Sequence, residues 1–169
     1  QLAVRAGAGA AEAARQASYG GMVLALGTII GCVAAPFLAE RLGRRKAMAI
    51  FFSFMGVAIV VAFGYVFYLE SALSWFYLCI LLLGLGGANF ALYTLWLPEQ
   101  YPTDCRASAI AFVSSVGRFV GVAMVFLVGA GIRNYGSLGI PVAVTALAFL
   151  FGLLVLPLSE ETRGKSLPA

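Results

Sequence analysis

The chain has 169 residues, of which 62% are hydrophobic and 11% are charged, and its mean hydropathy is +0.98. A soluble domain carries about 25% charged residues, so this chain has too few polar side chains to cover a water-facing surface. Its formal net charge is +4, and its basic residues stand in short clusters between apolar runs, which excludes the basic stripe of a nucleic-acid-binding protein. The composition therefore predicts a membrane protein.

Residues 1–18 form an Ala- and Gly-rich stretch before the first long apolar run. We expect them to be an extracellular or periplasmic loop, or the remnant of a preceding helix. The chain opens with Gln1 rather than Met, and no basic segment precedes a short apolar one, so no signal peptide is expected. We expect the sequence to be a truncated part of a longer protein.

Charge-free stretches long enough to cross a bilayer follow one another along the chain. A spanning helix needs about 20 apolar residues, because backbone polar groups must find partners within the segment when water is absent. An all-α, polytopic transmembrane bundle of five helices is therefore predicted over residues 19–158, with a tail over 159–169. The predicted spans are 19–39, 47–67, 73–97, 107–130 and 138–158. Because the connections are short, neighbouring spans are expected to be antiparallel.

Basic residues gather on one side of the predicted bundle. The loops 40–46 and 98–106 and the tail hold seven Lys and Arg residues, against three on the other side. Basic loops mark the cytoplasmic side, so the C-terminus is predicted inside and the N-terminus of the chain outside the cell membrane. The seven are Arg41, Arg44, Arg45, Lys46, Arg106, Arg163 and Lys165.

The first cytoplasmic loop carries a recognisable motif. A glycine, Gly31, precedes the segment Glu40-Arg-Leu-Gly-Arg-Arg-Lys46, in which Gly43 permits a tight reversal. This resembles the signature of the major facilitator superfamily, a helix glycine followed by Asp/Glu-Arg-x-Gly-Arg-Arg/Lys in the turn. Any short inside loop is basic, however, so this motif alone does not decide the family.

Two later segments extend the resemblance. Leu97-Pro-Glu-Gln-Tyr-Pro-Thr-Asp-Cys-Arg106 resembles the segment between the tenth and eleventh helices in the sugar-porter, sialate-symporter and organic-acid branches. The tail Glu160-Glu-Thr-Arg-Gly-Lys-Ser-Leu-Pro168 resembles a Pro-Glu-Thr-Lys-Gly ending, although Glu160 stands where proline is usual. The resemblance implies that the five spans are helices eight to twelve of a twelve-helix carrier. The N-terminal half would then be a missing partner.

Such carriers rock two six-helix bundles around a central site. The resemblance implies that cytoplasmic charges hold the bundles together when the outside is open. We predict that Glu99 and Arg106 bridge to the 40–46 loop or the tail, and the alternative is that these charges are solvated and only set topology. The candidate gate residues are Glu40, Arg41, Gly43, Arg44, Arg45, Glu99, Arg106, Glu161 and Arg163.

Six residues are candidates for a solute pathway. Arg118 is the single charge in mid-span, and such a charge faces a substrate or a structural partner because its burial in hydrocarbon is costly. Ser114 and Ser115 lie one turn away. Asn89, Tyr93 and Trp96 follow Gly86 on one helical face, which suits either a cavity wall or interhelical hydrogen bonding.

These features predict a fragment of a secondary active transporter for a small organic anion or sugar, with or without a co-transported proton or sodium ion. A truncated, non-transporting scaffold and a sugar uniporter are the alternatives. The chain has no histidine and all seven acidic residues lie at helix ends or loops, so no enzyme, cofactor or metal is expected. The three cysteines lack the spacing of a zinc site or a disulfide framework.

Overall fold

The computed structural model describes residues 2–5, 7, 9–69 and 72–165, and every regular element among them is helical. Five helical stretches are long and apolar enough to cross a membrane. Their bounds are Ala10–Leu42, Arg44–Tyr68, Ala72–Gln100, Arg106–Tyr135 and Gly139–Leu158. The predicted all-α bundle of five spanning helices is confirmed.

The first two long helices meet at a single glycine. A short helix α1 (Leu2–Arg5) precedes α2 (Ala10–Leu42), which continues through Glu12 and Arg15. Residues 10–18, predicted as a loop or remnant, are thus continuous with the first long helix, because charged residues end an apolar run without ending a helix. After Gly43 comes α3 (Arg44–Ile59), followed by the π-helical η1 (Val60–Tyr65) and the 3-10 turn η2 (Val66–Tyr68).

Of the remaining three long helices, the third and the fifth are interrupted where the sequence indicated single spans. The third consists of α4 (Ala72–Gly87), α5 (Asn89–Trp96) and the 3-10 turn η3 (Leu97–Gln100), with a break at Ala88. The fourth, α6 (Arg106–Tyr135), is continuous. The fifth consists of α7 (Gly139–Val144), α8 (Ala146–Val155) and η4 (Leu156–Leu158).

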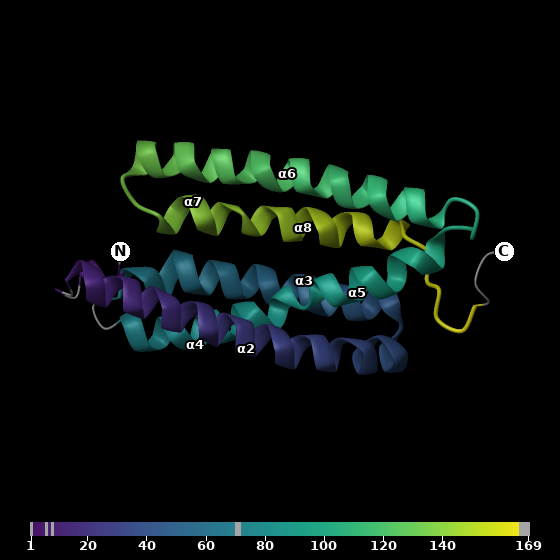
Figure 1. Ribbon diagram of the computed structural model, residues 1–169, viewed down its shortest axis with the longest axis horizontal. Helices are drawn as coiled ribbons and strands as arrows, with labels where there is room; N and C mark the ends of the chain where they lie inside the picture. The colour runs from purple at the N-terminus through teal and green to yellow at the C-terminus, as the bar shows by residue number, and fades with distance from the viewer. Residues whose placement is uncertain (1, 6, 8, 70–71, 166–169) are drawn as a thin grey trace.

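The helices lie side by side along one long axis (Figure 1). In this view α2 and α4 occupy one edge, α3 and α5 the middle, and α6 the opposite edge beyond α7 and α8. The backbones of α2 and α4 approach closely, since Gly27 and Gly84 each lie where an added Cβ would overlap a backbone carbonyl of the other helix. Small residues permit this approach where lipid gives no hydrophobic drive for helices to associate.

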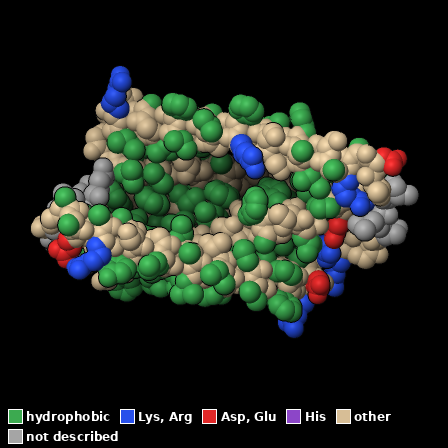
Figure 2. Space-filling view, in the orientation of Figure 1, with side chains coloured by type: hydrophobic (Ala, Val, Ile, Leu, Met, Phe, Trp, Pro, Cys, Tyr) green, Lys and Arg blue, Asp and Glu red, His purple; other side chains and the backbone are tan. Residues whose placement is uncertain are grey.

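One buried cluster lies between α2, α3 and α5, where Met48 and Leu92 are the largest fully buried side chains, and a second lies between α3, η1, η2 and α4. By contrast, α6 has no buried residue among those described, and its Phe119 is 79% exposed. Figure 2 shows hydrophobic side chains spread over the visible face and lining a hollow along its length. Such exposed apolar surface fits a helix bundle immersed in lipid.

Candidate functional site

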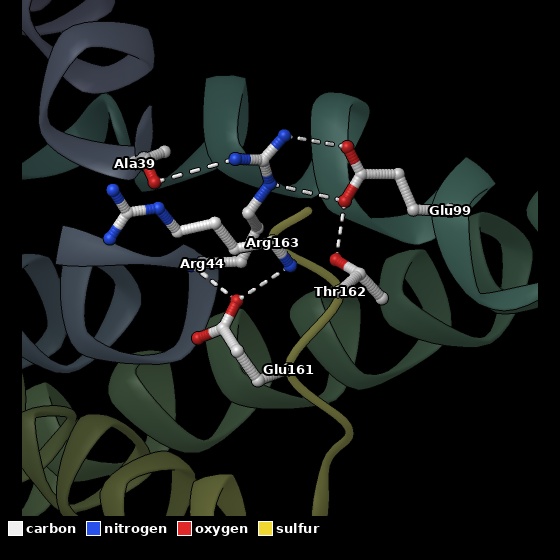
Figure 3. A network of polar contacts seen from close by, with 6 residues as sticks. All are labelled: Ala39, Arg44, Glu99, Glu161, Thr162 and Arg163. Carbon is white, nitrogen blue, oxygen red and sulfur yellow. Dashed lines mark hydrogen bonds and ion pairs between the residues drawn. The ribbon is translucent and has the colours of Figure 1, made fainter. Parts of the chain in front are cut away.

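Three segments that are far apart in the sequence meet at one end of the bundle (Figure 3). They are the turn around Gly43, the end of the third long helix at Glu99, and the tail after Leu158. These are the segments that carry the three motifs. The polar contacts among them are formed by residues on α2, α3, η3 and the tail, so this motif cluster ties most of one end of the bundle together.

Arg44 and Glu99 form the central ion pair. The Nε and Nη2 atoms of Arg44 donate to the two carboxylate oxygens of Glu99 at 3.1 and 2.8 Å. Their side chains are only 16% and 18% exposed, so water screens the pair less than it does a surface ion pair. The third nitrogen, Nη1, donates to the Ala39 carbonyl at 3.4 Å, and the Thr162 hydroxyl also donates to Glu99. The fork geometry of arginine explains this fixed, two-point contact.

Glu161 caps the N-terminus of α3 from the tail. Its carboxylate accepts the backbone N–H groups of Arg44 at 2.8 Å and Arg45 at 3.0 Å, and that of Arg163 at 3.2 Å. The first backbone donors of a helix have no partner within it, and they favour a negative charge. Partial burial raises the pKa of Glu161, but these three donors and the charge of Arg44 outweigh burial and lower it below its usual value.

Gly43 makes this cap possible. Its φ of 95° and ψ of 160° place it in a region that only glycine adopts readily. A Cβ added there would lie 2.7 Å from Glu161 Oε2. The glycine of the first motif and the glutamate of the third are therefore coupled by direct contact.

Some of the other predicted gate residues connect the first loop with the segment after α8, and others do not. Arg45 donates to the Pro157 carbonyl at 3.0 Å, and Arg163 to the Arg41 carbonyl at 2.8 Å, so both link the first loop with the segment after α8. The Nε atom of Arg106 donates to the Tyr101 carbonyl at 3.1 Å, within its own loop. Glu40 is exposed. Glu99 thus contacts both the first loop, through Arg44, and the tail, through Thr162.

Thr162, which is not among the residues predicted from the sequence, is 8% exposed and hydrogen-bonds Glu99. A threonine in a polar tail carries no signal of its own. Its position beside Glu161, inside the third motif, is the only feature that pointed to it.

The polar stripe on the third long helix lines a cavity of about 690 Å³. Asn89, Tyr93 and Trp96 face this cavity from α5, and side chains of α3 and α8 form its other walls. Gly86 instead lies against Met55 of α3, because the break at Ala88 separates it from the α5 face. The three side chains therefore share one hollow.

Arg118, Ser114 and Ser115 lie on α6 and are exposed. The Ser115 hydroxyl donates to the Ala111 carbonyl one turn back, at 2.8 Å. None of these three is among the described residues that line the Asn89 cavity. Within this chain, the two groups of pathway candidates are thus separate.

The motif cluster and the five spans agree with a comparison against known families. The family model described as "Major Facilitator Superfamily" matches residues 10–169. The chain belongs to this superfamily. It is accordingly a multi-pass membrane protein of a transporter family.

Several curated members of the superfamily resemble this chain. It is 31% identical to the niacin transporter NiaP of Acinetobacter baylyi over 86% of this chain and 33% of the relative. It is 29% identical to the inner membrane metabolite transport protein YhjE of Escherichia coli over 86% of this chain and 33% of the relative. A gallate transporter of Pseudomonas putida is 28% identical over 85% of this chain and 31% of the relative. The chain spans about a third of the length of these relatives.

Proposed function

We propose that this major facilitator chain is part of a secondary active transporter that moves a small organic anion by alternating access. Relatives named for niacin, gallate and cis,cis-muconate support the solute class, because all three compounds carry a carboxylate. Since the chain spans about a third of its relatives, we further propose that other helices, including an N-terminal bundle, complete the carrier. The observation that carries the proposal is the family match together with the folding of three motif segments into one tied end.

The motif cluster is proposed to be the cytoplasmic latch of this carrier. Exposed ion pairs contribute only about 0–1 kcal/mol each, so control of the open-in and open-out states needs a network. The partly buried Arg44–Glu99 pair, joined by Thr162 and by the Glu161 cap, supplies one. Because it ties the first loop, η3 and the tail together, this end would move as a rigid unit when the bundles rock.

The solute is proposed to pass along the Asn89–Tyr93–Trp96 cavity, and Arg118, which lies outside that cavity on α6, is proposed to meet its carboxylate at another point of the pathway. Tyr93 is 42% exposed and Trp96 is 5% exposed, so the cavity offers a polar rim over an aromatic floor. A guanidinium binds a carboxylate at two points. This proposal requires that Arg118 face the pathway in the assembled carrier, opposite helices contributed by the rest of the protein.

Uptake by the full-length transporter containing this sequence tests the solute class. Cells or proteoliposomes would be given labelled niacin, gallate and glucose, with and without an ionophore. We expect uptake of niacin or gallate. If transport is coupled to an ion gradient, the ionophore should abolish that uptake. Arg118→Gln should weaken carboxylate affinity by at least about tenfold, and Arg133→Gln on the same helix is the matched control. Glucose uptake without carboxylate uptake would contradict the proposal, and uptake of neither would favour the scaffold alternative.

Two further experiments test the latch and the side of the membrane on which it lies. Glu99→Lys should change the balance of inward- and outward-open states and the transport rate, and unchanged transport would count against the latch.

Cys105 is exposed at this end of the bundle, whereas Cys79 is buried. A membrane-impermeant thiol reagent should label Cys105 in inside-out vesicles and not in intact cells. The reverse pattern would overturn the cytoplasmic placement.

A further inference from the structure

A long apolar groove runs between the second and fifth long helices. It has a volume of about 720 Å³ and is lined from α3 and η1 on one side and α7 and α8 on the other. Phe52 and Phe149, whose rings meet edge to face 5.8 Å apart, line both this groove and the Asn89 cavity. The groove is therefore distinct from the proposed solute cavity, with an aromatic pair standing between them.

Small side chains on α3 keep the groove open. Ser53 and Gly56 line it, and a Cβ added at Gly56 would make only ordinary contact, 3.7 Å from Phe149 Cβ. The rims are apolar and exposed, since Val57 is 63% and Leu150 53% exposed. In a bilayer this groove has to be filled by an apolar group, because an empty groove loses dispersion contacts.

One end of the groove opens into a charged mouth. A second hollow of about 430 Å³ is lined by Arg45, Lys46, Ala49 and Glu161, and Leu153 of α8 lines both hollows. Both oxygens of Glu161 already accept backbone N–H groups of α3. Arg45 uses one nitrogen on the Pro157 carbonyl, and Lys46 is exposed. The mouth thus has two cationic side chains against one engaged carboxylate.

We infer that the groove binds one anionic phospholipid, with its phosphate at Arg45 and Lys46 and an acyl chain between α3 and α8. Ala49 on α3 and Val60 at the start of η1 are eleven positions apart, which is about 16 Å of helix. Half of a bilayer's hydrocarbon core is about 15 Å, so this part of the groove matches one leaflet. Basic pockets between spanning helices suit anionic headgroups. The charge at the mouth selects an anionic lipid over a zwitterionic one.

Lipid binding to the purified full chain in detergent tests the inference. Native mass spectrometry and thermal shift would compare phosphatidylglycerol, phosphatidylcholine with the same acyl chains, and glycerol phosphate. We expect the wild type to prefer phosphatidylglycerol over phosphatidylcholine and to gain no stability from glycerol phosphate. Lys46→Gln should weaken phosphatidylglycerol binding about fivefold, and the Arg45→Gln, Lys46→Gln double variant about 25-fold.

Two variants separate the chain site from the headgroup site. Val57→Trp fills the groove and should weaken binding of both lipids, leaving the Lys46 site intact. Arg133→Gln and Val125→Trp are matched controls outside the groove, at exposed positions of α6, and should leave binding unchanged. Undiminished phosphatidylglycerol binding in the double variant or in Val57→Trp would overturn the inference. So would equal binding of both lipids, or stabilisation by glycerol phosphate alone.

Discussion

Replacing Gly43 by alanine tests how the first motif and the tail are joined. Two effects act against the alanine. Its backbone would have to hold φ near 95° and ψ near 160°, and its Cβ would lie 2.7 Å from the Glu161 carboxylate. A residue forced into such a conformation costs about 1–3 kcal/mol. Displacing Glu161 would also release the backbone N–H groups of Arg44 and Arg45 at the start of α3.

Thermal unfolding of the purified chain, followed by circular dichroism, measures the effect. We expect Gly43→Ala to lower the free energy of unfolding by at least about 1–3 kcal/mol, and Tm by about 2–12 °C for a chain of this size. Gly117→Ala is the matched control, because Gly117 is an exposed helical glycine with open space around its Cβ position. That substitution should be neutral or stabilise the protein by up to about 1 kcal/mol.

A double-mutant cycle separates steric contact from backbone strain. In a Glu161→Ala background the clash is absent and only the strain remains, so Gly43→Ala should be less destabilising there. Coupling between directly contacting residues is about 0.5–3 kcal/mol. If Gly43→Ala is as stable as the wild type, or if its effect is the same in both backgrounds, the proposed contact between the two motifs is wrong.

Three further predictions concern the same end of the bundle and the contact between α2 and α4. Glu99→Gln loses a partly buried charged contact and should lower the free energy of unfolding by about 1–3 kcal/mol in thermal melts. Glu12→Gln, in an exposed ion pair, should change the free energy of unfolding by less than about 0.5 kcal/mol. Because the pKa of Glu161 is lowered in the folded state, its stabilisation is present above the usual carboxyl pKa of about 4.3 and is lost as the pH falls through the folded value. The Tm difference between wild type and Glu161→Gln should therefore shrink on acidification, and a difference that grows would refute this. Gly27→Ala should destabilise the chain by about 1–3 kcal/mol, because its Cβ would overlap a backbone carbonyl of α4, while Gly121→Ala, in open space, should not.

The number of spanning helices and the meeting of the three motifs at one end followed from local information. A run of apolar residues without charge predicts a spanning helix whatever its neighbours do, and short connections fix alternating directions. The helix ends were less predictable. Glu12 and Arg15 ended the first apolar run, yet α2 begins at Ala10, because a helix continues past the point where its side chains leave hydrocarbon.

Asn89, Tyr93 and Trp96 lie within the uninterrupted α5 and line one cavity, because residues three and four positions apart share a helical face. Helical spacing did not place Gly86 on the same face, because the helix is broken at Ala88. No single residue in the sequence predicts that break. Nor did periodicity relate this stripe to Arg118, because the relative rotation of two helices depends on their packing.

The sequence by itself thus determined the class of protein, its five spans and which segments carry the polar contacts, because hydropathy and charge act residue by residue. Only the tertiary structure decided that Glu161 caps α3 against Gly43, that Thr162 joins the Arg44–Glu99 pair, and that small residues on α3 open a groove beside α8. The physical reason is that hydrogen bonds and grooves depend on distances between segments over 50 residues apart in the chain. Those distances are set by helix packing and not by any local pattern.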